Sequence, residues 1–66
     1  MTLVVNGETR SIEAPRSVLD FLAGFGLEAK MVVVERNGLI LPRDSYGETM
    51  LDEGDVLEIV QMMAGG

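Results

Sequence analysis

The chain has 66 residues, 47% of them hydrophobic, and its 11 acidic residues against 5 basic ones give a formal net charge of -6. A chain of this length forms one small domain, and without Cys it has neither a disulfide nor a thiolate metal site to stabilise it. The acidic balance argues against nucleic acid as a partner and favours a protein with a basic surface. Because no apolar run approaches a membrane span and no signal-peptide pattern occurs, we expect a cytoplasmic protein without membrane contact.

The first predicted element is a β-hairpin. Residues 1–6 place apolar side chains at every second position, and the Asn6-Gly7 pair that follows is a strong turn signal. The second arm is predicted from Thr9 to Ala14, where Ile12 and Ala14 share the face that is turned to the core.

A short helix is predicted next. Ser17 occupies the N-cap position, with Asp20 three residues on as a variant of the capping box. Gly24 and Gly26 supply the stop signal. Apolar side chains recur at i, i+3, i+4 and i+7, which predicts one buried stripe and places both Phe residues in the core. This stripe consists of Val18, Phe21, Leu22 and Phe25.

Two further strands follow the helix. Residues 31–34 are continuously apolar and mostly β-branched, which indicates a strand that is buried on both faces or central in a sheet. The Asn37-Gly38 pair predicts a second tight turn, and residues 39–41 a brief strand that ends before Pro42. Residues 43–51 have little periodicity and are predicted as a loop with room for a single helical turn.

The last predicted strand covers residues 56–62, after a turn at Asp52-Glu53-Gly54-Asp55. Leu57 and Ile59 are expected on one side of this strand, and Glu58, Val60 and Met62 on the other. The order hairpin, helix, strand, short strand and final strand predicts an α+β domain, in which one helix packs across a mixed sheet.

The chain ends on Gly65 and Gly66, which suit a terminus that is used as a substrate. Without a Cβ, two glycines can pass through a narrow channel and leave the terminal carbon unshielded. A carboxylate must first be activated, for instance as an acyl adenylate, before a nucleophile can add to its carbon. The alternative is an inert, frayed tail, since chain ends are often disordered unless they are tied down.

Several segments together resemble the sulfur-carrier proteins of thiamine biosynthesis, which have the ubiquitin-like β-grasp fold. The resemblance covers essentially the whole chain. It rests on Glu35-Arg36-Asn37-Gly38, Leu41-Pro42-Arg43, Asp52-Glu53-Gly54-Asp55 and the ending Ala64-Gly65-Gly66. One departure is Tyr46, where members of the family often carry Trp, and it affects only a packing detail. The resemblance implies a β-grasp domain over residues 1–63 and a flexible reactive tail over residues 64–66.

The resemblance also implies a function. A ubiquitin-activating-type adenylyltransferase would use ATP to adenylate the Gly66 carboxylate, sulfur from a donor would then convert it to a thiocarboxylate, and thiazole synthase would receive that sulfur. The chain itself has no Cys to act as nucleophile, no His to act as base near neutral pH, and no Gly-rich loop followed by Lys. We therefore expect a carrier that is not an enzyme, that binds no cofactor or metal, and that is a monomer when free.

The partner-binding surface is predicted in two parts beside the tail. Exposed Met is an adaptable contact residue, so an apolar docking patch is expected at the end of the last strand. Acidic side chains before and within this strand could steer the carrier to a basic groove, although those of the turn could instead serve only the turn. The predicted partner-binding residues are Asp52, Glu53, Asp55, Glu58, Val60, Met62, Met63, Ala64 and Gly65.

Other functions stay open at this point. The small subunit of molybdopterin synthase resembles this chain in fold and in its Gly-Gly ending, although its members are usually longer. A ubiquitin-like protein modifier is a further alternative. From a different class, the chain could be a plain β-grasp interaction module whose tail takes part in no chemistry.

Overall fold

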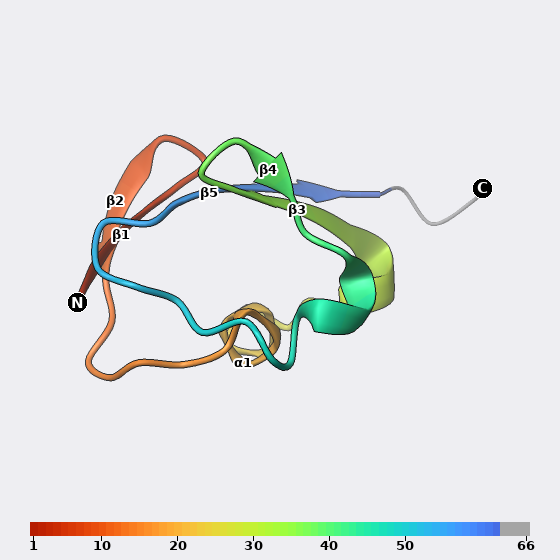
Figure 1. Cartoon of the computed structure of the whole chain (residues 1–66), viewed down its shortest axis with the longest axis horizontal. Helices are drawn as coiled ribbons and strands as arrows, with labels where there is room; N and C mark the ends of the chain where they lie inside the picture. The colour runs from red at the N-terminus through yellow and green to blue at the C-terminus, as the bar shows by residue number, and fades with distance from the viewer. Residues whose placement is uncertain (63–66) are drawn as a thin grey trace.

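One mixed sheet with a helix across one of its faces makes up the fold (Figure 1). The structure is a computed structural model and describes residues 1–62. Its elements are β1 (Thr2–Val5), β2 (Glu8–Ser11), α1 (Val18–Ala23), β3 (Val32–Arg36), β4 (Leu39–Ile40) and β5 (Val56–Gln61), with 3-10 turns at Ala29–Met31 and Arg43–Ser45. The predicted order of elements, and with it the α+β class, is confirmed. No helix within the described residues is long and apolar enough to cross a membrane.

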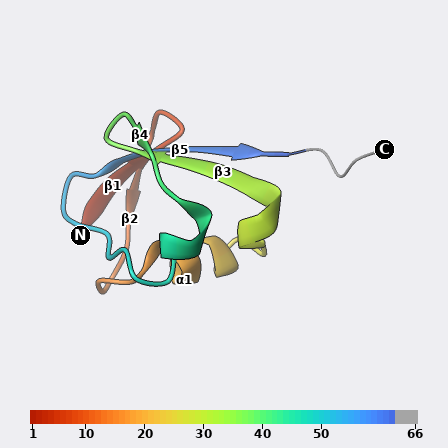
Figure 2. The same cartoon turned by 45° about the vertical axis from the view of Figure 1, so that its right-hand side comes forward.

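The strands lie in the order β2-β1-β5-β3-β4, so β5 occupies the middle of the sheet. β1 runs parallel to β5, whereas the β1–β2, β3–β5 and β3–β4 pairs are antiparallel. Figure 2 shows α1 on one side of the sheet, while no element covers the opposite side within the described part of the chain. The sheet therefore has a buried inner face and an open outer face.

Both predicted Asn-Gly turns are confirmed. Asn6 and Gly7 have φ of 50° and 81°, and Asn37 and Gly38 have φ of 52° and 86°. Positive φ at both central residues is the geometry of a type I′ hairpin turn, which Asn and Gly tolerate best. Each Asn thus serves the local turn that its sequence neighbourhood predicts.

The same two Asn side chains also bind the central strand. Asn6 Oδ1 accepts the N–H of Ile59 at 2.7 Å, and Asn6 Nδ2 donates to the carbonyl of Ile59 at 3.2 Å. Asn37 Oδ1 accepts the N–H of Val56 at 2.9 Å. Because β1 pairs with β5 only at Val56 and Leu57, the Asn6 amide continues the hydrogen bonding where β1 ends. The two turns therefore hold β5 in place by hydrogen bonds from both sides.

The second arm of the first hairpin is shorter than predicted. Ile12 still exchanges hydrogen bonds with Met1, but β2 ends at Ser11, Ile12 is only half-buried, and Ala14 is exposed. No residue of β1 lies opposite the segment after Ile12, so its backbone has no ladder to continue. The prediction that Ala14 faces the core is wrong.

Both ends of α1 are as predicted, but the helix does not extend to Phe25. Ser17 Oγ accepts the N–H of Asp20 at 3.0 Å, which confirms Ser17 as the N-cap. The helix ends at Ala23, and the next turn closes at Gly26, which has φ of 73°. Phe25 therefore lies beyond the helix, where the i+7 spacing no longer directs its side chain inward. Phe25 is 47% exposed, so the prediction of a core Phe25 is wrong, whereas that of Phe21 is confirmed.

The core lies between α1 and the inner face of the sheet. Its buried residues are Leu3, Val5, Val18, Phe21, Leu22, Val32, Val34, Tyr46, Leu51 and Leu57. β3 begins at Val32, because Met31 belongs to the preceding 3-10 turn. Val32 and Val34 are fully buried, but Val33 between them is only half-buried. The sequence predicted that this strand is either buried on both faces or central in a sheet. The second alternative is correct, because β3 lies between two other strands, and the first is wrong.

Tyr46 has a larger role than the packing detail that the sequence suggested. β4 has only two residues, so it leaves the Val34 N–H and the Val32 carbonyl at that edge of β3 without a strand partner. The Tyr46 hydroxyl accepts the N–H of Val34 at 3.2 Å and donates to the Val32 carbonyl at 3.5 Å. Tyr46 is 2% exposed, so one side chain both fills the core and satisfies buried backbone groups.

Replacing Tyr46 with Phe tests this role. The variant keeps the ring but leaves the buried N–H of Val34 without its acceptor, which costs about 1 to 3 kcal/mol. We expect a lower urea midpoint with an unchanged m-value, because the surface that unfolding exposes stays the same. A midpoint equal to that of the unmodified protein would show that the hydroxyl contributes nothing to stability.

Candidate functional site

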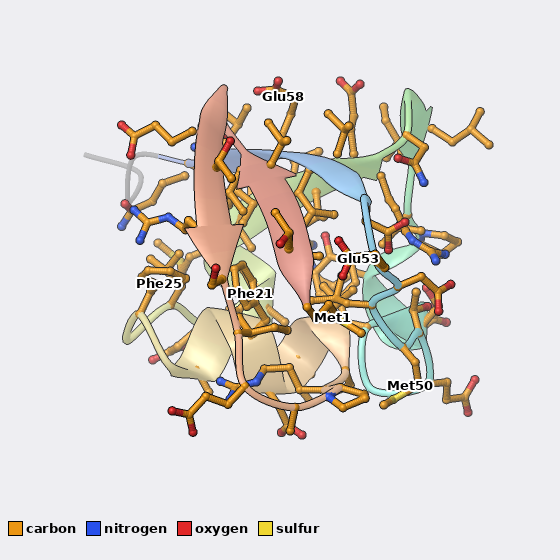
Figure 3. The ribbon with its side chains drawn as sticks, turned by 90° about the vertical axis from the view of Figure 1, so that its left-hand side faces the viewer. Met1, Phe21, Phe25, Met50, Glu53 and Glu58 are labelled. Atoms are coloured by element: carbon orange, nitrogen blue, oxygen red, sulfur yellow. The ribbon has the colours of Figure 1, made fainter. Side chains whose placement is uncertain are left out.

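β5 is the strand that leads into the predicted functional tail, and its side chains divide as predicted. Leu57 is buried and Ile59 half-buried toward α1, while Glu58 and Val60 lie on the outer face. Figure 3 shows Glu58 directed away from α1. Val60 is 60% exposed and Met62 is 37% exposed. The predicted docking residues of this strand are thus accessible in the described structure.

The outer face brings further residues beside them. In antiparallel pairs, directly opposite residues point to the same side of a sheet. Val60 lies opposite Val33, Glu58 opposite Glu35, and Glu35 in turn opposite Ile40 on β4. We call this set the outer-face patch. It consists of Val33, Glu35, Ile40, Val56, Glu58 and Val60.

Sequence reasoning missed four members of the patch, which are Val56 on β5 and the three residues on β3 and β4. The β-branched run of β3 pointed to burial, and the pairing register that turns Val33 outward cannot be read from local periodicity. Glu35 and Ile40 gave no signal except their place on either side of the Asn37-Gly38 turn. In a tight hairpin such flanking positions face each other, and this could have found them.

Glu35 and Glu58 form an unusual pair, because two carboxylates lie directly opposite each other on neighbouring strands. Like charges in this position destabilise a sheet. Neither carboxylate is in an ion pair in the described structure. The pair therefore concentrates negative charge among the apolar residues of the outer-face patch.

The tail begins at the end of β5. The N–H of Met62 donates to the carbonyl of Met31 at 2.7 Å, so the 3-10 turn before β3 holds the chain up to the last described residue. The predicted partner-binding residues Met63, Ala64 and Gly65, and the predicted substrate Gly66, lie outside the described residues.

The acidic turn lies at the opposite end of β5 from the tail. At about 3.3 Å per residue, the seven steps from Asp55 to Met62 span about 23 Å. Asp52 Oδ2 contacts Arg36 Nη2 at 3.0 Å, and Glu53 Oε1 accepts the N–H of Thr2 at 2.9 Å. The structure thus does not bring the turn acids together with Val60 and Met62, although Asp52 and Glu53 stay exposed.

Asp55 is not a surface residue, and its prediction as a partner contact is corrected. It is 5% exposed, and its carboxylate accepts hydrogen bonds from Arg36 Nε at 2.9 Å, Asn37 Nδ2 at 3.1 Å and the N–H of Asp52 at 2.8 Å. Burial alone would raise the pKa of this carboxyl. The hydrogen bonds from Asp52, Asn37 and Arg36 and the charge of Arg36 outweigh burial, and they lower the pKa below its ordinary value. Asp55 therefore acts inside the fold, where it joins the β3–β4 turn to the start of β5.

Within residues 1–62, no group of three or more His, Cys, Asp or Glu side chains is placed to hold a metal ion. The sequence contains no Cys and no His. What the described part of the site offers is a surface, with an apolar patch, a pair of carboxylates and an anchored strand end that leads to the terminal glycines.

Comparisons with known proteins identify a family with this fold, and the match includes the terminal glycines of the chain. The model of the ThiS family matches residues 3–66. The sulfur carrier protein ThiS of Bacillus subtilis is 44% identical over 50 residues, which cover 76% of each chain. A crystal structure of the thiamine biosynthesis protein ThiS from Geobacter metallireducens superimposes with a TM-score of 0.84, at 32% identity and with full coverage of both chains. The β-grasp fold is thereby confirmed.

Two longer proteins are also similar. A thiazole synthase of Paramagnetospirillum magneticum is 42% identical over all 66 residues, and one of Magnetococcus marinus is 36% identical over the same length. The chain spans about a fifth of the length of each. A segment like this chain thus forms part of proteins that are named thiazole synthase.

Proposed function

We propose that this chain, which belongs to the ThiS family, is a sulfur carrier of thiamine biosynthesis, and that it carries sulfur as a thiocarboxylate on the terminal carbon of Gly66. The observation that carries this proposal is the family match, which runs from residue 3 through Gly66 and so includes the terminal glycines. In this proposal, partner enzymes bind the carrier through residues 1–62, and the tail is the substrate.

The chemistry takes place in two steps on the tail. An oxygen of the Gly66 carboxylate attacks the α-phosphorus of ATP, and pyrophosphate leaves. Hydrosulfide (HS⁻) supplied by a sulfur donor then adds to the activated carbonyl carbon, AMP leaves with the electron pair of the broken C–O bond, and loss of the proton on sulfur gives the thiocarboxylate. The carrier has no Cys and no His, so a ubiquitin-activating-type adenylyltransferase and its sulfur donor supply the ATP site and the reacting groups. The carrier itself is not a catalyst.

The acceptor in this proposal is a thiazole synthase in the cytoplasm. The support is that two proteins of that name contain a segment similar to this chain. When a carrier and its acceptor are parts of one chain, the effective concentration of the carrier at the acceptor rises. Such a fusion is useful only for two partners that meet repeatedly. A carrier of this kind can serve the same acceptor by docking.

We further propose that the outer-face patch, continued by Met62, docks on the activating enzyme while the tail enters its active site. The patch has exposed apolar residues around two opposed carboxylates, which suits a partner surface with apolar contacts and an Arg or Lys between Glu35 and Glu58. Ordering the tail costs about 1 to 2 kcal/mol per residue, and its small side chains offset little of that cost. Main-chain hydrogen bonds to the tail and the contacts of the docked patch offset this free-energy cost.

Replacing Val60 with Asp tests the docking patch. Val60 is 60% exposed, so the fold tolerates the change, but a buried carboxylate at an apolar contact is expected to weaken binding by at least about tenfold. Met50→Asp is the matched control, because Met50 is also exposed but lies outside the sheet. Calorimetric titration with the activating enzyme measures both. Equal affinity of the two variants would exclude the outer-face patch as the docking surface.

Replacing Glu58 with Gln tests electrostatic steering. Relief of the repulsion from Glu35 should raise the free energy of unfolding by about 0.2 to 1 kcal/mol, while association with the enzyme should slow and depend less on salt. Glu48→Gln, at an exposed loop position, removes the same charge as a control. Stopped-flow binding at two ionic strengths measures the rates. If both variants associate at the rate of the unmodified protein, the carboxylate pair takes no part in steering.

The mass of the intact protein tests the proposed function itself. Carrier purified from its own cells under thiamine limitation should contain a fraction that is heavier by the replacement of one oxygen with sulfur. This fraction should disappear when Gly66 is deleted. A single unmodified mass from cells that are making thiamine would contradict the proposal and favour a plain interaction module.

A further inference from the structure

β2 is the outermost strand on one side of the sheet, and its free edge faces away from β1. All four of its residues are exposed. The N–H of Ile12 donates to Met1, and hydrogen-bonded pairs alternate along an antiparallel ladder. The peptide groups of Thr9 and Ser11 must therefore point to the open edge. An open edge of this kind is a template for an added strand.

A hollow of about 330 Å³ runs between this edge and α1. The rings of Phe21 and Phe25 form its apolar side, with their centroids 5.1 Å apart in an edge-to-face arrangement. Figure 3 shows both rings between β2 and the helix. A second hollow of about 260 Å³ adjoins it at Arg10 and Phe25 and extends toward Ile59. The two hollows share Arg10 and Phe25 as lining residues, and we call them together the β2–α1 groove.

The groove carries positive charge on a strongly acidic protein. Only 5 of the 66 residues are basic, and two of these, Arg10 and Arg16, line it, against one acidic lining residue, Glu8. The Arg10 guanidinium lies 5.1 Å from the centre of the Phe25 ring, and its contact with Glu8 at 3.7 Å is exposed and therefore weak. Arg16 has no ion pair among the described residues.

The other basic residues are engaged elsewhere. Arg36 holds the acidic turn through Asp52 and Asp55, Arg43 donates to backbone carbonyls, and Lys30 contacts Glu28. The fold therefore uses Arg36 and Arg43 internally, whereas the two guanidinium groups of the groove stay available to a ligand.

We propose that the β2–α1 groove binds an extended acidic peptide segment of a partner protein, which adds to β2 as a further strand. The peptide backbone pairs with Thr9 and Ser11, an apolar side chain covers the exposed Phe25, and flanking Asp or Glu side chains contact Arg10 and Arg16. Backbone pairing gives affinity, and the pockets and charges give specificity. The groove lies on the helix side of the sheet, so such a partner does not compete with one on the outer-face patch.

The test uses a synthetic eight-residue peptide, with two acidic residues at each end and four alternating Val and Ile residues between them. Its control has Lys in place of the acidic residues. Titration into isotope-labelled carrier, followed by NMR, should move the amide signals of Thr9, Ser11 and Phe25 in a saturable way and leave those of Val33 and Val60 in place. The Lys peptide should bind at least about tenfold more weakly.

Two variants make the test specific. Thr9→Pro removes the edge N–H and adds a clash along the open edge, which an outer strand tolerates, so the variant should fold normally and lose peptide binding. Arg16→Glu should weaken binding by at least about tenfold, whereas Lys30→Glu changes the net charge equally and should have little effect. Shifts confined to the outer face, no saturable binding, or unchanged binding by Thr9→Pro would each overturn the proposal and leave Arg10 and Arg16 as charges that protect an open edge from aggregation.

Discussion

Deletion of Gly66 is expected to abolish ATP-pyrophosphate exchange by the activating enzyme while it leaves the stability of the domain unchanged. The deletion moves the carboxylate back by one residue, which is a shift of about 3.3 to 3.6 Å along an extended chain. A misplacement of only about 1 Å can cost about a hundredfold in rate, so a shift of this size removes the reacting oxygen from any productive geometry. The core and every described hydrogen bond lie within residues 1–62 and do not depend on Gly66.

Exchange of labelled pyrophosphate into ATP measures this prediction, and urea unfolding of the same preparation checks the fold. Gly65→Val is a useful companion, because it keeps the chain length and adds a branched side chain where a narrow channel should accept none. It should dock with normal affinity through the outer-face patch and react slowly in a single turnover. Normal exchange by the truncated protein, or a normal single-turnover rate for Gly65→Val, would show that the terminal glycines are not the reacting segment.

Replacement of Asp55 with Ala is expected to destabilise the domain by about 3 kcal/mol. The variant leaves Arg36 Nε, Asn37 Nδ2 and the N–H of Asp52 without their common acceptor. At about 0.05 to 0.15 kcal/mol per residue, a chain of this size has only about 3 to 10 kcal/mol of stability in total. The loss is therefore a large part of the whole, and a substantial unfolded fraction is expected on mild heating.

Asp44→Ala is the matched control for Asp55→Ala. Asp44 is exposed in the 3-10 turn, so its removal should change the free energy of unfolding by less than about 0.5 kcal/mol. Thermal and urea unfolding of both variants give the comparison. If the two variants have the same free energy of unfolding, the buried carboxylate network contributes no more to stability than a surface charge does.

The same network predicts a pH dependence. Because the folded protein lowers the pKa of Asp55, the ionised carboxylate stabilises the fold at pH values above the unfolded pKa of about 3.9, and this stability is lost as the pH falls through the lower folded pKa. Asp55→Asn removes the ionisation. The difference in stability between the unmodified protein and this variant should be constant at neutral pH and shrink in acid. A difference that stays constant or grows on acidification would contradict the assignment.

Much of the candidate site could be predicted from the sequence, because its signals are local. The alternation along residues 56–62 was enough to place Glu58, Val60 and Met62 on one side of the last strand. The pairing of Val33 with Val60 and of Glu35 with Glu58 could not be predicted, because the register between β3 and β5 is set by contacts between residues that are far apart in the chain. The reacting tail remains a sequence-based prediction, since residues 63–66 lie outside the described structure.

The sequence by itself determined the features that depend on a few neighbouring residues. Asn6-Gly7 and Asn37-Gly38 form their turns because few other residues tolerate positive φ, and Ser17 begins the helix because its hydroxyl accepts an otherwise unpaired N–H. The order of such elements was also sufficient to predict the α+β fold.

Only the tertiary structure decided what the same side chains do at a distance. Asn6 and Asn37 also bind β5, and Tyr46 completes an edge of β3, since these backbone groups have no strand partner in the folded sheet. Asp55 became an internal acceptor because Arg36 and Asn37 converge on it, and Phe25 became exposed because α1 ends before reaching it. Each of these outcomes depends on which segments meet across the sheet, and that information is not contained in local periodicity.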